Sequence, residues 1–348
     1  EMFAKGLSVA PELGYPCWAH PMGNTSHVAH HNTGMIDRSP QYKSAISRGD
    51  LELFAAAPEA SFVEVSAAPD GFPNRVYRRA VCLADAPNDN VYLTDLLSLA
   101  GGTVRTCCFH GPGHDDFQTN LTFGAKAETL DVGEVGRGLA NNIVEPQVAS
   151  SDGEVWGDWK CKGKEVRVRL TYLGEPGRRY ITARCAKPDI PPIRYLFAEE
   201  EAPDGASQFV SIWQPYEGTP FVGKVERVPV QGNVTGEFSP VAVRVTVAGE
   251  QVDTFVYASD PQADLRVGDL EFKGSFGYWS ELNGKPRAAH LVNGAYLRKG
   301  DVGIADMPPP FRAHVTAADL ESSTLTLDAG LPKDQDWTEQ LLFIRAGD

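Results

Sequence analysis

Four of the chain's eight histidines, His20, His27, His30 and His31, lie within twelve residues near its start. Neutral imidazole is the commonest protein ligand for zinc, so this density indicates a metal or substrate site. If residues 26–33 are extended, His27 and His31 point to the same side of the chain, because side chains alternate with a period of two. We therefore predict that these two residues share a site. The alternative is that the histidines are surface or turn residues satisfied by water and backbone.

Further along the chain, other side chains could meet an anionic ligand. His110 lies in a turn-like segment and can line a cleft or bind a cation, with a plain polar turn as the alternative. Arg78 and Arg79 suit carboxylates because guanidinium pairs with them in a forked geometry. Alternation sends the two arginines to opposite faces, so at most one contacts a ligand. We take Arg78, His110 and His27 as candidate substrate contacts, with an ion pair between Arg78 and Glu64 as the alternative.

The elements that must position these residues are strands. Short β-branched and aromatic runs alternate with Gly, Pro, Asn and Asp turns, which is typical of antiparallel sheets. The clearest runs are Ser61 to Val65, Arg75 to Leu83, Val91 to Leu99, Glu165 to Tyr172, Arg179 to Arg184, Phe209 to Trp213, Val241 to Val247 and Thr324 to Leu327. We predict an all-β chain with a large antiparallel β-sandwich over residues 1–217. After a change in composition near Glu217 we expect a smaller β domain over 218–348.

Composition narrows the possible partners. The chain of 348 residues carries a formal net charge of −14, which argues against binding to nucleic acid or to an anionic membrane surface. No apolar run approaches the roughly 20 residues of a membrane helix. The six cysteines show no metal-binding spacing, so buried thiols are favoured over disulfides. We expect a periplasmic or secreted protein, with the cytoplasm as the alternative.

A series of motifs follows one another in a recognisable order. They are Phe3–Leu7 (FAKGL), Pro11–Pro16 (PELGYP), His31–Thr33 (HNT) with Asp37 and Gln41 after it, Val76–Arg79 (VYRR), Tyr92–Leu96 (YLTDL), Gly101–Gly102, Phe109–Gly111 (FHG), Ser207–Val210 (SQFV) and Gln214–Tyr216 (QPY). This order resembles the C-terminal domain of the heparinase II/III-like polysaccharide lyases, a family that includes the oligoalginate lyases. The resemblance covers residues 1–230 well and the remainder loosely.

The resemblance implies a zinc site. In that family the ion is held by the second His of an HxH segment, by an Asp in the region matched by PELGYP, and by the His of HNT. His31 matches the last of these. Glu12 stands where the family has Asp, so its longer side chain either shifts the ligand geometry or is not a ligand. The HxH segment would precede Glu1, so we expect a structural zinc site that is only partial in this chain.

The resemblance also implies β-elimination from a uronic acid in an acidic polysaccharide or oligosaccharide. The family's catalytic Tyr and His residues lie mostly on an upstream α/α toroid of the same enzyme, so we assign no catalytic residue here. The chain is then the β-sandwich part of a lyase that holds zinc and one wall of the substrate cleft. The alternatives are a carbohydrate-binding or scaffolding β-sandwich without catalysis and, third, a metal hydrolase built on the cluster His20 to His31.

Overall fold

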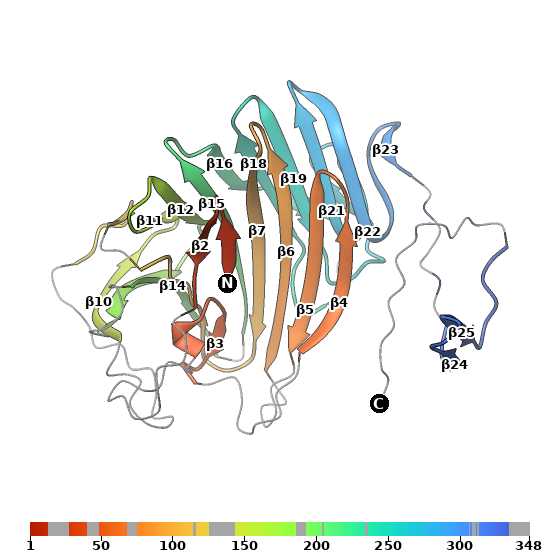
Figure 1. Ribbon diagram of the computed structural model, residues 1–348, viewed down its shortest axis with the longest axis horizontal. Coiled ribbons are helices and arrows are strands. Elements are labelled where there is room, and N and C mark those ends of the chain that lie inside the picture. The colour runs from red at the N-terminus through yellow and green to blue at the C-terminus, as the bar shows by residue number, and fades with distance from the viewer. Residues whose placement is uncertain are drawn as a thin grey trace.

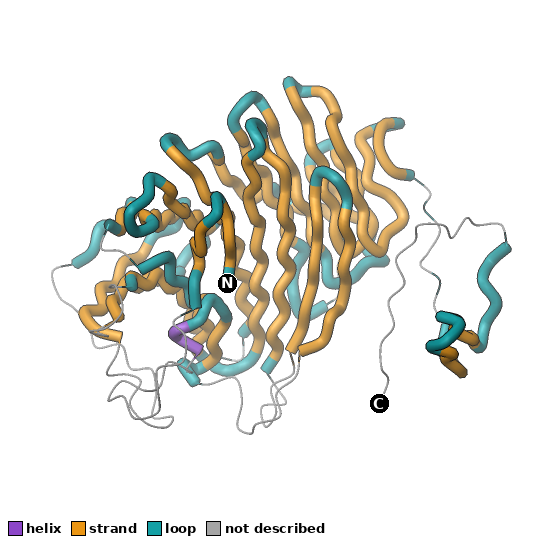
Figure 2. Tube along the Cα trace, viewed as in Figure 1, coloured by secondary structure: helices purple, strands orange, loops and turns teal. Residues whose placement is uncertain are grey.

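Strands form almost all of the regular structure in this computed structural model (Figures 1 and 2). It describes residues 1–12, 28–39, 49–67, 75–113, 116–124, 143–185, 193–203, 205–233, 236–305, 307, 311 and 313–333. Within these ranges the single helix is the three-residue 3-10 helix η1, Val28–His30. No helix of the described part has the length and apolar character needed to span a membrane. The all-β fold class predicted from the sequence is confirmed.

The largest continuous layer is an antiparallel sheet of eight strands, called here the middle sheet. Its strands in spatial order are β4 (Gly49–Ala56), β5 (Ala60–Ala67), β6 (Val76–Ala86), β7 (Asn90–Ala100), β15 (Ala206–Glu217), β12 (Val166–Tyr172), β11 (Val155–Lys160) and β9 (Phe117–Thr119). The β6–β7 turn has left-handed backbone at Asn88 and Asp89, two residue types that tolerate positive φ. These strands contain five of the eight runs that the period-two pattern predicted.

A five-stranded sheet lies against one face of the middle sheet. It consists of β10 (Ile143–Ser150), β13 (Arg179–Cys185), β14 (Arg194–Glu201), β8 (Val104–Cys107) and β3 (Gly34–Ile36). The N-terminal hairpin β1 (Met2–Ala4) and β2 (Leu7–Ala10) contributes Val9 and Ala10 to the same core. This hairpin and η1 bring Glu12 and His31 to the same part of the molecule.

The C-terminal sheet covers the opposite face of the middle sheet. It consists of β16 (Val222–Arg227), β18 (Val241–Val247), β19 (Gln251–Tyr257), β21 (Leu270–Leu282), β20 (Leu265–Val267) and β17 (Val230–Gln231), with β22 (Lys285–Lys299) and β23 (Val302–Ile304) attached to β21. A separate hairpin, β24 (Val315–Asp319) and β25 (Thr324–Leu327), has mostly exposed residues.

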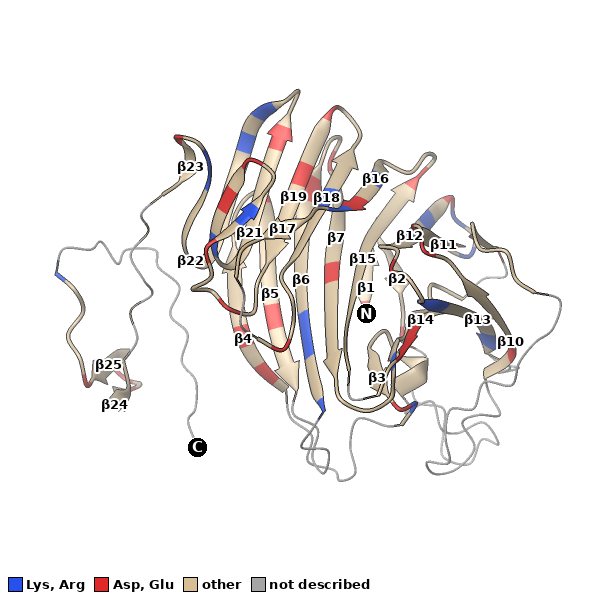
Figure 3. Ribbon diagram, turned by 180° about the vertical axis from the view of Figure 1, so that it is seen from behind, with Lys and Arg blue, Asp and Glu red and all other residues tan. Residues whose placement is uncertain are grey.

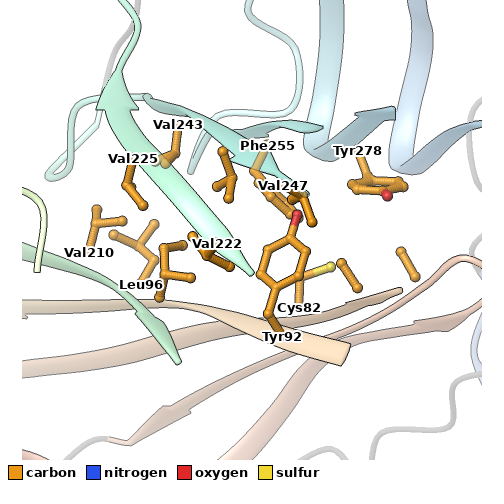
Figure 4. Packing of buried hydrophobic residues seen from close by; sticks show 14 of the residues in the cluster. Cys82, Tyr92, Leu96, Val210, Val222, Val225, Val243, Val247, Phe255 and Tyr278 are labelled. Carbon is orange, nitrogen blue, oxygen red and sulfur yellow. The ribbon is translucent and has the colours of Figure 1, made fainter. Parts of the chain in front are cut away.

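Alternation along the strands of the middle sheet explains the three layers. In β7, Tyr92 and Leu96 pack toward the C-terminal sheet, whereas Leu97 and Leu99 pack toward the five-stranded sheet. Figure 4 shows the first of these two cores, where Tyr92 and Leu96 meet side chains of the C-terminal sheet such as Phe255. Because both faces of the middle sheet are buried, its central strands are apolar on both sides.

Residues 28–30 form a 3-10 helix in which His31 N donates to Val28 O at 3.0 Å, so the prediction of an extended chain is wrong for these three residues. The division between residues 217 and 218 stays a prediction. One hydrophobic core draws on both sides of that position, from Phe62 and Tyr92 to Phe255 and Tyr278.

Candidate functional site

Glu12 and His31 lie in direct contact. His31 Nδ1 is 2.5 Å from Glu12 Oε2, and the two side chains are 35% and 38% exposed. Glu12 follows strand β2 and His31 follows η1, so the contact depends on the N-terminal hairpin lying beside that helix. The two residues that the sequence predicted as metal ligands therefore share one site. With Nδ1 facing the carboxylate, Nε2 of His31 is the ring nitrogen left for a ligand.

The segment that carries His31 is fixed to the middle sheet through Asn32. Arg79 Nη1 donates to Asn32 O at 2.7 Å, and Asn32 Oδ1 accepts a hydrogen bond from His110 N at 2.8 Å. Arg79 is itself held by Asp95, whose two carboxylate oxygens lie 2.9 and 2.6 Å from Nε and Nη2. Figure 3 shows a basic band on β6 and an acidic band on the neighbouring strand β7. Asn32 is therefore held through both its backbone carbonyl and its side-chain oxygen.

His110 lies directly behind this segment and is fully buried. Its Nδ1 is 3.1 Å from Gly111 O, which favours the tautomer with the proton on Nδ1. Among the described residues, Nε2 of His110 has no hydrogen-bond partner. Burial lowers the pKa of His110 from its ordinary value of 6.5, and the charges of Glu12 and His31 also act on it. Because the His110 ring is fully buried, it reaches a substrate only if the surrounding loops move. The predicted contact between His110 and substrate therefore stays a prediction.

A second buried histidine packs beneath the site. His30 Nδ1 lies 2.8 Å from Tyr195 Oη, and the rings of His30 and His110 both pack against the Tyr195 ring. All three side chains are fully buried. Burial raises the pKa of Tyr195 well above 10, so this phenol stays protonated at neutral pH. This cluster therefore supports the floor of the site.

One predicted substrate contact, Arg78, is not brought to this cluster. Arg78 lies on the face of β6 opposite Arg79, and its Nη1 is 3.1 Å from Glu64 Oε1 on the neighbouring strand. That ion pair is the alternative anticipated from the sequence. His27, like His20, lies outside the described residues.

The donor types at Glu12 and His31 fit zinc, which binds imidazole nitrogen and carboxylate oxygen. The described part of the chain contains no group of three or more His, Cys, Asp or Glu side chains placed to hold a metal ion. With Glu12 at Nδ1, the donor that the pair offers to a metal is His31 Nε2, and further donors would come from outside the described residues. Cys82, Cys107, Cys108, Cys161 and Cys185 are buried free thiols, as expected, and Cys17 lies outside these residues.

Comparisons with known proteins give fold-level likenesses only. Searches of protein families and of curated proteins found no match. Among solved structures, the chain is similar to heparinase III with 14% identity and a TM-score of 0.45, over 73% of this chain and 34% of that one. It is similar to heparan sulfate lyase HepC from Pedobacter heparinus with 14% identity and a TM-score of 0.40, over 71% and 34%. The chain therefore spans about a third of the length of these lyases.

Proposed function

We propose that this chain is the β-sandwich part of a polysaccharide lyase that cleaves uronic-acid-containing glycans by β-elimination. In this proposal Glu12 and His31 help to hold a structural zinc ion beside one wall of the substrate cleft. The ordered motifs between Phe3 and Tyr216 support the reaction class. The activity, the acidic glycan and the upstream α/α-toroid portion of the enzyme are all parts of the proposal.

One observation carries the proposal furthest. Glu12 and His31 are 19 positions apart, and the motifs alone singled out both, His31 as a matched ligand and Glu12 at the position where the family has Asp. The fold places their side chains 2.5 Å apart at the surface, on a segment that Asn32 and Arg79 fix to the middle sheet. Their carboxylate and imidazole are also suitable donors for zinc.

The chemistry requires three tasks. One group must neutralise the uronate carboxylate so that the C5 proton becomes acidic, a base must remove that proton, and an acid must protonate the leaving O4. Zinc, when bound, supplies positive charge that fixes its ligands and the loops that carry them. In this chain Glu12 orients the His31 ring through Nδ1, and Asn32 holds the backbone on which that ring stands. No catalytic acid or base is assigned here.

The activity test uses this chain together with any residues that its gene encodes before Glu1. Alginate, heparinoids and ulvan are offered as substrates, and the ultraviolet absorbance of the unsaturated product is followed. We expect turnover of at least one of them, and a loss of at least about tenfold in His31→Ala. The control is Lys285→Ala, since Lys285 is exposed at the start of β22 in the C-terminal sheet.

Two results would contradict the proposal. One is the absence of product from every uronate glycan, accompanied by measurable glycan binding, which would favour the alternative of a carbohydrate-binding module. The other is a His31→Ala variant that turns over substrate like the unmodified protein.

A further inference from the structure

A second cluster of charged and aromatic side chains lies on the other face of the middle sheet. The guanidinium of Arg169 on β12 stands 4.4 Å from the centroid of the Trp156 ring and 5.9 Å from that of Tyr216. Trp156 lies diagonally across on β11, and Tyr216 diagonally across on β15, so the cation is flanked from both neighbouring strands. Leu170, the next residue on β12, points the opposite way, into the core shared with the five-stranded sheet.

A buried carboxylate fixes the orientation of Arg169. Asp158 is 1% exposed, and its Oδ2 accepts hydrogen bonds from Arg169 Nε at 2.8 Å and from Tyr216 Oη at 2.6 Å. Its other oxygen accepts from Arg167 Nε, and Arg167 also binds Asp116 through both terminal nitrogens. Arg167 is thereby occupied by two carboxylates, whereas Arg169 uses only its Nε.

The two terminal nitrogens of Arg169 make no hydrogen bond to any residue in the described part of the chain, and its side chain is 23% exposed. A guanidinium with both Nη groups available presents a fork that matches a carboxylate or a sulfate in a bidentate geometry. Stacking between two rings and the bond to Asp158 fix this fork in advance, which reduces the entropy lost when a ligand binds. Trp156 is partly exposed beside it and offers an aromatic surface.

The C-terminal sheet reaches the edge of this cluster. Gln214, opposite Arg169 on β15, accepts from Phe221 N and Val222 N through Oε1, and Val225 N of β16 donates to Glu154 Oε2 at 3.4 Å. The Glu154 carboxylate, two residues before Trp156, also acts on the charge of Arg169. The adjoining β11–β12 turn carries Lys160, Lys162 and Lys164. Lys160 pairs with Glu165 at 2.9 Å, so the terminal nitrogens of Arg169 are the part of this cluster that remains open to an anion.

We propose that Arg169 and Trp156 form a binding site for one acidic sugar unit of a glycan, in which Arg169 takes the carboxylate or sulfate and Trp156 stacks on the sugar ring. It lies on the opposite face of the middle sheet from Glu12 and His31 and does not depend on zinc or catalysis there. Such a site would retain a long acidic chain on the protein at a second point.

Isothermal titration of the 348-residue chain tests this site. The probes are a hexasaccharide of alginate, which carries only carboxylates, a hexasaccharide of heparin, which also carries sulfates, and neutral cellohexaose. We expect at least one acidic probe to bind and cellohexaose not to bind. Arg169→Gln and Trp156→Ala should each weaken binding by roughly tenfold, with an intermediate loss in Arg169→Lys.

Matched variants separate this site from the rest of the protein. His31→Ala and Arg184→Gln should bind the acidic probe like the unmodified chain, since Arg184 pairs with Glu145 on the five-stranded sheet. Thermal unfolding shows whether each variant is folded. If Arg169→Gln does not fold, the binding measurement on Trp156→Ala tests the proposal instead. The Trp156 ring is partly exposed, so we expect its removal to leave the fold intact. The proposal is overturned if folded Arg169→Gln or Trp156→Ala binds with unchanged affinity, if His31→Ala alone abolishes binding, if cellohexaose binds equally well, or if neither acidic probe binds.

Discussion

Asn32 joins the candidate site to the core of the protein. Its carbonyl accepts from Arg79 and its side-chain oxygen accepts from His110 N, so the residue after His31 is held from two sides. Arg79 in turn neutralises Asp95, whose side chain is only 3% exposed. The backbone next to His31 is therefore held by the Arg79–Asp95 ion pair of the middle sheet.

Arg79→Met should destabilise the chain by about 3 kcal/mol, because it leaves the Asp95 carboxylate buried without its partner. Denaturant unfolding followed by circular dichroism measures this change. The control is Arg184→Met, whose partner Glu145 is 59% exposed, and it should cost less than about 1 kcal/mol. Equal losses in the two variants would contradict the role given to Arg79.

At the scale of single residues, the sequence predicted part of the candidate site. Motif order selected Glu12 and His31, and alternation correctly placed Arg78 and Arg79 on opposite faces. It did not reveal that Asn32 and Tyr195 take part. The bond from His30 to Tyr195 joins residues 165 positions apart, and no local pattern encodes which distant strand supplies such a partner.

At the scale of elements, strands were easier to predict than their connections. The run Val241 to Val247 coincides with β18, because alternating β-branched residues fit a pleated layer with one face buried. The segment before His31 was predicted to be extended, yet it closes into η1 through an i to i+3 hydrogen bond. Tertiary packing of Val28, Ala29 and His30 overrides the short-range pattern there.

Polar links between layers give this sandwich a pH dependence. Tyr92 Oη on β7 donates to Asp253 Oδ2 on β19 at 2.5 Å, and Gln251 Nε2 donates to the same oxygen at 2.8 Å. Burial raises the pKa of Asp253 above its ordinary value of 3.8. The folded state then binds a proton more tightly than the unfolded state, so stability from this group is present at low pH and is lost as pH rises through the raised pKa.

The variant Asp253→Asn should not lose stability in this way as pH rises, because it has no carboxyl group at this position. We expect the melting temperature of the unmodified chain, relative to this variant, to fall as pH rises from about 4 to 7. Thermal unfolding in a series of buffers gives the comparison. A difference between the two proteins that stays constant or grows with pH would show that the carboxylate is not destabilised by burial.

At the scale of the whole molecule, the middle sheet serves two cores. The period-two pattern predicted strands such as β7, but it did not indicate which sheet covers each face. The core on one side contains Phe62 and Tyr92 from before position 217 and Phe255 and Tyr278 from after it. Whether the chain divides into two domains near residue 217 therefore depends on whether each part folds without the other.

Two truncations answer that question. A chain ending at residue 217 would expose the apolar face of β5 and β7, so we predict loss of cooperative unfolding. A chain ending at residue 305 loses the hairpin of β24 and β25, whose residues are mostly exposed, and should melt at the same temperature as the full chain. Cooperative unfolding of the 1–217 fragment at the temperature of the full chain would instead support the division predicted from the sequence.

Zinc content tests the central claim most directly. The chain, purified with any residues that its gene encodes before Glu1, is analysed for bound metal in the unmodified form and as His31→Ala and Glu12→Gln. The proposal predicts one zinc ion per chain in the unmodified protein, loss of most of it in His31→Ala, and an affinity reduced by roughly 10- to 100-fold in Glu12→Gln. An unmodified protein without zinc, or a folded His31→Ala variant that keeps the full amount, would contradict the account.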